Sequence, residues 1–157
     1  MVRRIMREAQ LGATNFASED DWICVTCRAC VQQCPRGVEI IDVMRAIRRA
    51  IVRLGVGVVP DALRITTKNI AGVGNPMGEE STKRNDWARD SGVKRFGPDA
   101  EVLFFPCCYP AYDPDVKTVA RSTTTILGRL GIKFGIMGTE VRCCGEAVRK
   151  AGNEDVF

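Results

Sequence analysis

Four cysteines stand close together near the N-terminal end of the chain, and a proline follows the last of them. They have the spacing C-x2-C-x2-C-x3-C-P and are Cys24, Cys27, Cys30, Cys34 and Pro35. Thiolates at this spacing hold [4Fe–4S] clusters, although the fourth cysteine of such a run often ligates a second cluster. Pro35 ends the loop because its ring fixes φ and it has no N–H group. The motif therefore predicts a ferredoxin-type [4Fe–4S] site.

Two other uses of closely spaced cysteines compete with this prediction. Structural zinc also takes four thiolates, but its ligand pairs usually lie on two turns that are well separated in sequence. Disulfides form in oxidising compartments, and the charged N-terminal segment leads into no apolar core of a signal peptide. Four cysteines within eleven residues therefore favour the iron–sulfur interpretation over both alternatives.

The other four cysteines form two adjacent pairs, Cys107-Cys108 and Cys143-Cys144, and the chain contains no histidine. None of the eight cysteines is isolated in the sequence, which indicates metal ligation rather than packing. Gly145 and the start of a predicted helix follow the second pair, and a helix N-terminus favours thiolates. We therefore expect a second metal site with Cys108, Cys143 and Cys144 as ligands and Cys107 as a further candidate.

Other functions for the cysteine residues stay open at this point. A zinc-binding interaction module without catalytic activity would use the same thiolates. Cys143 and Cys144 would be the reactive pair if the protein were a thiol–disulfide oxidoreductase. Free cysteines are also often ordinary buried residues with no chemical role.

The residues on either side of the first motif are predicted to be helical. Apolar side chains at helical spacing predict a short amphipathic helix over residues 2–11 and a longer helix over residues 38–54. Gly55 is expected to end the longer helix. A third helix is expected to run from Pro60 to Ile70, since proline is favoured in the first turn of a helix.

Two groups of side chains near the first motif have predicted roles. Ser18 and Asp21 are expected to cap a turn, after which Trp22 and Ile23 would shield the cluster from water. The longer helix carries arginines outside its apolar stripe, namely Arg45, Arg48, Arg49 and Arg53. These arginines are predicted to form a solvated face, and the alternative is a docking patch for an acidic redox partner.

The second half of the chain is predicted to contain a βαβ unit. An apolar run over residues 101–106 predicts a buried strand, a helix follows from Pro114 to Gly131, and residues 132–136 predict the next strand. Strands joined in this way are parallel. Both cysteine pairs then follow the C-terminal ends of the two strands, where open α/β sheets place their functional sites.

These elements predict an α+β fold made of two domains. Residues 1–71 are expected to form a helical, ferredoxin-like [4Fe–4S] domain. Residues 72–100 are polar and rich in glycine and proline, which predicts a linker. Residues 101–157 are expected to form an α/β domain that carries the two cysteine pairs.

The composition argues against several classes of function. The net charge is +4, the basic residues are spread along the chain and aromatic residues make up 6%, so no nucleic-acid-binding surface is expected. No stretch approaches the roughly 20 apolar residues that a membrane helix needs. We therefore expect a cytoplasmic protein without a transmembrane segment, whose cysteines stay reduced or bind metal.

Further landmarks along the chain extend the cysteine motifs into a longer pattern. In chain order they are Trp22 to Cys27, Cys34 to Ile40, Gly74-Asn75-Pro76, Asp86-Trp87-Ala88, Cys108 with Tyr112-Asp113-Pro114, Cys143 to Glu146, and Arg149 to Phe157. Together they resemble the iron–sulfur oxidoreductases related to heterodisulfide reductase. That family includes the D subunit of heterodisulfide reductase and the iron–sulfur subunits of glycolate oxidase and of anaerobic glycerol-3-phosphate dehydrogenase.

The resemblance implies an electron-transfer subunit of an oxidoreductase, in which a ferredoxin-type 4Fe-4S cluster passes electrons to a cysteine-rich CCG site. In heterodisulfide reductases that site holds a second, non-cubane 4Fe-4S cluster, where a disulfide is cleaved. The implied partners are other subunits of a redox complex, of the flavoprotein, cytochrome or hydrogenase type. Through such a partner the chain would lie at the inner face of the membrane.

Several features of the family are missing from this sequence. No second cysteine motif precedes Cys24, and neither a C-x2-C pair nor a second CCG follows Gly145. Cys107 stands where the family mostly has glycine. We therefore expect a fragment or one product of a split gene, with an incomplete CCG domain whose cluster is completed by residues absent from this chain.

Overall fold

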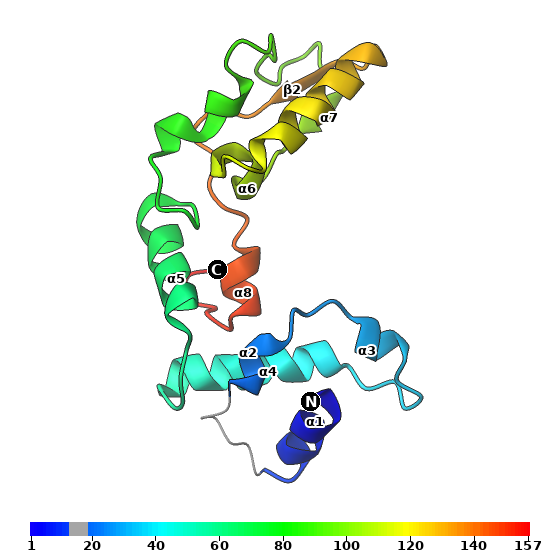
Figure 1. Ribbon diagram of the computed structural model, residues 1–157, viewed down its shortest axis with the longest axis vertical. Coiled ribbons are helices and arrows are strands. Elements are labelled where there is room, and N and C mark those ends of the chain that lie inside the picture. The colour runs from blue at the N-terminus through cyan, green and yellow to red at the C-terminus, as the bar shows by residue number, and fades with distance from the viewer. Residues whose placement is uncertain (13–18) are drawn as a thin grey trace. The chain divides into compact units, whose positions relative to one another are not determined.

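The structure is a computed structural model that describes residues 1–12 and 19–157 of the chain (Figure 1). Helices and a small two-stranded parallel sheet make up its regular structure, which agrees with the predicted α+β class. The chain forms two compact units with different bounds from the expected domains. The first unit contains Met1–Thr67 and Gly145–Phe157, and the second contains Lys68–Cys144.

Short helices packed on one long helix form the first unit. Their bounds are α1 Val2–Gln10, α2 Asp20–Ile23, α3 Ala29–Gln32 and α4 Ile40–Leu54. The predicted apolar stripe of α4 is buried: Met44, Ile47 and Ile51 pack with Ile5 of α1. Gly55 adopts the left-handed conformation and ends α4, as the sequence predicts. Ser18 lies outside the described residues.

The C-terminal residues of the chain belong to the first unit, although the sequence places them in the second domain. Helix α8 (Glu146–Lys150) packs on α4 (Figure 1). Beyond it, the Arg49 guanidinium pairs with the Glu154 carboxylate, with an Nη2 to Oε1 distance of 2.5 Å. Gly152 has φ +79° and lies so close to α4 that a Cβ atom there would be 2.4 Å from the backbone nitrogen of Arg49.

Replacing Gly152 with alanine is therefore expected to lower the free energy of unfolding by about 3 kcal/mol, because a left-handed backbone and a clash with α4 both oppose the new methyl group. Denaturant unfolding would measure the loss. Gly55→Ala is the matched control: Gly55 has φ +63° and nothing within 4 Å of the position that a new methyl group would take, so only about 1 kcal/mol is expected there. Equal losses in the two variants would contradict close packing of the C-terminal segment on α4.

The βαβ unit predicted from the sequence is present in the second unit, but its first strand is not buried as predicted, since Val102 and Leu103 are 39% and 45% exposed. Its elements are β1 Val102–Phe104, α6 Cys108–Tyr112, α7 Lys117–Arg129 and β2 Phe134–Ile136. Strands β1 and β2 are parallel, with Leu103 opposite Gly135. Helix α7 begins later than predicted, because the Asp113 carboxylate accepts the N–H groups of Asp115 and Val116 and forms a turn before the helix.

The segment expected to be a linker contributes to the core of the second unit. Helix α5 (Asp61–Val73) leads into it, and a 3-10 helix, η1 (Ser81–Ala88), lies within it. Trp87 of η1 is 0% exposed and packs with Ala111, Tyr112 and Ile136. Glycine, proline and polar residues dominate the sequence of this segment. Its Trp87 side chain nevertheless packs in the core of the second unit, against residues of α6 and β2.

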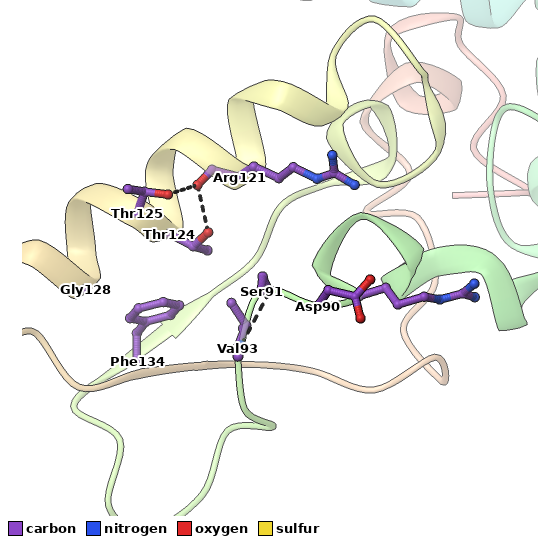
Figure 2. Close-up of a pocket in the computed structure, with 10 residues that line it drawn as sticks. Asp90, Ser91, Val93, Arg121, Thr124, Thr125, Gly128 and Phe134 are labelled. Atoms are coloured by element: carbon purple, nitrogen blue, oxygen red, sulfur yellow. Dashed lines mark hydrogen bonds between the residues drawn. The ribbon is translucent and has the colours of Figure 1, made fainter.

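A pocket of about 610 Å³ in the second unit lies beside α7 (Figure 2). The hydroxyl groups of Thr124 and Thr125 in its wall donate to the Arg121 carbonyl at 2.9 Å, so they are satisfied within the helix. No cysteine of the described residues lines this pocket, which separates it from the sites that the sequence predicts. None of the helices in residues 1–12 and 19–157 is long and apolar enough to cross a bilayer.

Candidate metal centres

The first cysteine motif forms a tight loop between α2 and α4 that contains α3. Thr26 and Arg28 have positive φ values of 57° and 67°, which turn the chain sharply between the first cysteines. Three of the thiols pack against the core of the first unit, namely Cys24, Cys30 and Cys34. Cys27 is exposed. The loop thus exposes one thiol to solvent and packs the other three against the apolar core of the first unit.

Backbone N–H groups surround the last thiol of the motif. The Val38 N–H donates to Cys34 Sγ at 3.5 Å. Hydrogen bonds from the N–H groups of Val38 and then Arg36 lower the pKa of Cys34 below its usual range. The loop after Pro35 therefore favours the thiolate, which is the form that binds metal.

Only one of the two apolar residues expected to shield the motif has a shielding position. Trp22 packs against the core of the first unit, and its Nε1 donates to the Val58 carbonyl at 2.7 Å. Ile23 is 60% exposed, so that part of the prediction is wrong. Ile23 is the last residue of the four-residue helix α2, in which Asp21 is the buried residue.

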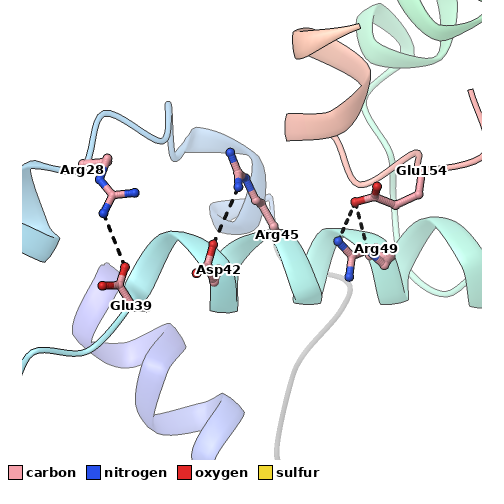
Figure 3. A network of polar contacts seen from close by, with 6 residues as sticks. All are labelled: Arg28, Glu39, Asp42, Arg45, Arg49 and Glu154. Carbon is pink, nitrogen blue, oxygen red and sulfur yellow. Dashed lines mark hydrogen bonds and ion pairs between the residues drawn. The ribbon is translucent and has the colours of Figure 1, made fainter. Parts of the chain in front are cut away.

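The arginines of α4 form the predicted solvated face only in part: the side chains of Arg49 and Arg53 are 41% and 60% exposed, whereas Arg48 is buried. Arg45 pairs with Asp42 and Arg49 with Glu154 (Figure 3). Arg53 pairs with Asp155 at the end of the helix. The remaining member of the set, Arg48, is buried at 4% exposure. Helical periodicity could not anticipate the burial of Arg48, because one of its partners, the Lys150 carbonyl, lies 102 residues away in the sequence.

The second set of cysteines is gathered at one place in the second unit. Cys108 is buried at the start of α6, Cys143 is half-buried against the same core, and Cys107 and Cys144 are exposed. Burial and, to a lesser extent, the nearby Cys143 thiol raise the pKa of Cys108 to about 11, against the opposing effect of Arg84. Burial, followed by the proximity of Cys144, also raises the pKa of Cys107. The structure thus brings together the two pairs that are far apart in sequence.

A turn at Gly74 positions the second pair. The Cys143 N–H donates to the Gly74 carbonyl at 2.7 Å. The next residue, Asn75, is almost fully buried, and its side-chain amide bonds both the N–H and the carbonyl of Glu79. The Gly74-Asn75-Pro76 landmark therefore has a structural explanation: it builds a rigid turn whose free carbonyl holds the backbone of the cysteine pair.

Sequence reasoning missed a buried cation beside the second cysteine set. Arg84 of η1 is 2% exposed, and its Nη1 donates to Cys108 Sγ at 3.7 Å. Its guanidinium carbon lies 5.7 Å from the Phe105 ring centre and 5.8 Å from that of Tyr112. Its Nη2 is buried without a hydrogen-bond partner among the described residues. No signal in the sequence distinguishes Arg84 from the other basic residues of a polar segment.

In neither set are the thiols arranged as a complete metal-binding site. Among residues 1–12 and 19–157, no three cysteine or carboxylate side chains converge tightly enough to hold one metal ion. Loops whose ligands are thiolates commonly reach their final geometry only with the metal, because binding and folding are coupled. The two cysteine sets therefore stay candidate sites, whose ligands would converge only when the metal binds.

Comparison with known proteins agrees with this picture. Residues 102–157 match the family described as CCG, cysteine-rich domain. A relative named EtfAB:quinone oxidoreductase, from Syntrophomonas wolfei, is 31% identical over 147 residues, which cover 89% of this chain and 20% of the relative. The probable iron-sulfur-binding oxidoreductase FadF of Bacillus subtilis is 32% identical over 151 residues, covering 90% and 21%.

Heterodisulfide reductase itself is among the relatives. The D subunit of dihydromethanophenazine:CoB--CoM heterodisulfide reductase from Methanosarcina barkeri is 28% identical over 134 residues, which cover 85% of this chain and 31% of the relative. The predicted resemblance is thus confirmed: residues 102–157 match the CCG cysteine-rich domain family, and most of the chain is similar in sequence to heterodisulfide reductase-related iron–sulfur oxidoreductases. The chain spans about a fifth to a third of the length of these relatives. No solved structure gives a significant match.

Proposed function

We propose that this chain is an electron-transfer module of a heterodisulfide reductase-like oxidoreductase, with one iron–sulfur cluster at each cysteine set. The ligands of the first cluster are Cys24, Cys27, Cys30 and Cys34. The second site uses Cys108, Cys143 and Cys144, with Cys107 beside them. The cysteine spacing of the first set and the contact of Cys108 with Cys143 in the second support the proposal. Bound clusters would supply reversible one-electron oxidation and reduction.

The charge balance of the second site supports an anionic occupant there. A buried guanidinium without a carboxylate partner is costly, because it loses hydration without gaining an opposite charge. No ion pair involves Arg84 within the described part of the chain, and burial keeps the Cys108 thiol neutral at ordinary pH by raising its pKa to about 11. Thiolates bound to iron would supply the missing negative charge beside Arg84.

Replacing Arg84 with methionine is expected to weaken iron retention at the second site by roughly 10- to 100-fold, the range for loss of a hydrogen bond to a charged group. Arg84→Lys keeps the charge and is expected to retain more iron. Titration with a chelator, followed by iron and labile-sulfide analysis, would measure both. If Arg84→Met held iron as firmly as the parent chain, Arg84 would not be the counter-charge of the site.

The composition of the purified metal centre tests the proposal as a whole. Anaerobically purified protein is expected to be brown and to contain iron and labile sulfide, with thiols protected from alkylation. A colourless, zinc-loaded chain would instead identify an interaction module. A chain without metal whose Cys143 and Cys144 react rapidly with an alkylating reagent would point to thiol–disulfide exchange. The same metal analysis would show whether the second cluster forms in this chain or needs ligands from elsewhere.

The proposed partners are other redox subunits, of the flavoprotein, cytochrome or hydrogenase type, since relatives are named as subunits of heterodisulfide reductases. A groove of about 940 Å³ in the first unit suits an acidic partner. The groove is lined by apolar residues and by Arg3, Arg7 and Arg36. None of these three arginines has an ion pair among the described residues. Arg36 belongs to the loop that follows Cys34, and Arg3 and Arg7 of α1 line the same groove. Such charges raise the rate of encounter with an acidic surface.

The location proposed for the chain is the cytoplasm, at the inner face of a membrane where a partner subunit anchors the complex. One relative, 29% identical over 151 residues, is named a probable membrane-anchored ferredoxin, from Chromohalobacter salexigens. Fractionation of cells that produce the tagged chain with and without its neighbouring subunits would test whether membrane association depends on a partner.

A further inference from the structure

The buried arginine of α4, Arg48, contacts the backbone of the first cysteine motif. Arg48 donates three hydrogen bonds to backbone carbonyls: Nε to Asp21 at 2.8 Å, Nη2 to Cys24 at 2.6 Å and Nη1 to Lys150 at 3.0 Å. Its guanidinium carbon also lies 5.4 Å from the centre of the Trp22 ring. These contacts fix the guanidinium in one position against the backbone of the first proposed cluster ligand.

The charge of this arginine is not cancelled by its hydrogen bonds. All three acceptors are neutral carbonyl groups, and Arg48 forms no ion pair within residues 1–12 and 19–157. Burial lowers the pKa of Arg48, against the opposing effects of Cys24 and then Asp21, but a guanidinium stays protonated in proteins. A fixed positive charge therefore lies in a poorly solvated place, where charges interact more strongly than at the surface.

We propose that Arg48 raises the reduction potential of the cluster bound by the first cysteine motif. The inference rests on the proposed function, because it needs a cluster at Cys24. Reduction adds one negative charge to an iron–sulfur cluster, and a nearby buried cation stabilises the reduced form more than the oxidised form. Arg48 would also hold the Cys24 backbone in place through its hydrogen bond. The effect of its charge on the potential therefore has to be separated by experiment from its effect on the position of the Cys24 ligand.

The chain and four variants of it separate the two effects. Arg48→Met removes the charge and the hydrogen bonds, Arg48→Gln removes the charge but keeps an amide donor, and Arg48→Lys keeps the charge. Arg53→Met is the matched control, because it removes one positive charge from the same helix at a side chain that is 60% exposed. Iron and labile sulfide are measured first, and the midpoint potential follows from a redox titration monitored by electron paramagnetic resonance.

The expected result is a more negative midpoint potential in Arg48→Met and Arg48→Gln, with little change in Arg48→Lys and none in Arg53→Met. A parental potential in Arg48→Met or Arg48→Gln with the full cluster would overturn the inference. Loss of the cluster from all three Arg48 variants, including the charged lysine, would also overturn it, because Arg48 would then only support the loop. A parent chain without iron and sulfide would refute the proposed function instead, which keeps the two failures distinct.

Discussion

Replacing Cys27 with serine is expected to remove about four irons per chain, the content of one cubane cluster. Cys27 is the exposed thiol of the first motif, so serine in its place disturbs no apolar contact. A hydroxyl group is a poor substitute for a thiolate ligand of iron. The loss of iron would therefore report on ligation rather than on packing.

The same substitution is also expected to destabilise the loop around it. Cys24, Cys30 and Cys34 pack on the core of the first unit only along one side, and metal binding commonly supplies much of the folding free energy of such small motifs. Iron and sulfide analysis with hydrogen exchange over residues 19–40 would measure both effects. Cys107→Ser, at another exposed thiol, should leave the first cluster in place. Unchanged iron in Cys27→Ser would show that the first motif is not an iron site.

Replacing Trp87 with alanine is expected to lower the free energy of unfolding of the second unit by about 3–5 kcal/mol, the usual cost of truncating a buried tryptophan. Trp87 is 0% exposed. Its ring meets that of Phe104 edge to face, with ring centres 5.9 Å apart, and its carbonyl accepts the Arg121 Nε–H at 2.9 Å. Alanine would leave a cavity in the core that the indole now shares with Ala111, Tyr112 and Ile136.

Denaturant unfolding of the metal-free, reduced protein is the suitable measurement, because bound metal would add its own contribution to stability. Trp87→Phe is the control: it keeps an aromatic ring against Phe104 and should cost less than half as much as alanine. A loss below about 1 kcal/mol in Trp87→Ala, the usual range for surface positions, would mean that residues 81–88 behave as the linker predicted from their composition.

The elements that depend on local periodicity could be predicted from the sequence. The apolar stripe of α4, its end at Gly55 and the parallel pairing of β1 with β2 all agree with the structure. These features follow from repeats of three to four residues in a helix and from short apolar runs in strands. Cysteine spacing likewise identified both sets of candidate ligands, since a thiol is recognisable wherever the chain places it.

The features that depend on contacts between distant segments could not be predicted. Arg48 bonds a carbonyl that lies 102 residues away, and Arg84 reaches a thiol 24 residues away. In the sequence both are ordinary members of basic, polar stretches. The packing of residues 145–157 could not be predicted for the same reason: the cysteine-rich family match covers residues 102–157, yet the packing partner of helix α8 is α4.

The discontinuous first unit has a consequence for protein synthesis. Its helices α1 to α4 leave the ribosome early, but Arg48 and Arg49 receive their partners, the Lys150 carbonyl and the Glu154 carboxylate, only after residues 68–144 have been translated. At about 5–20 residues per second this delay lasts several seconds. During that interval the thiols of the first cysteine motif are reduced and accessible, because the C-terminal part of the first unit has not yet been translated. Delivery of iron and sulfide would thus have to wait for the translation of residues 145–157, or a chaperone would have to protect the early cysteines from oxidation.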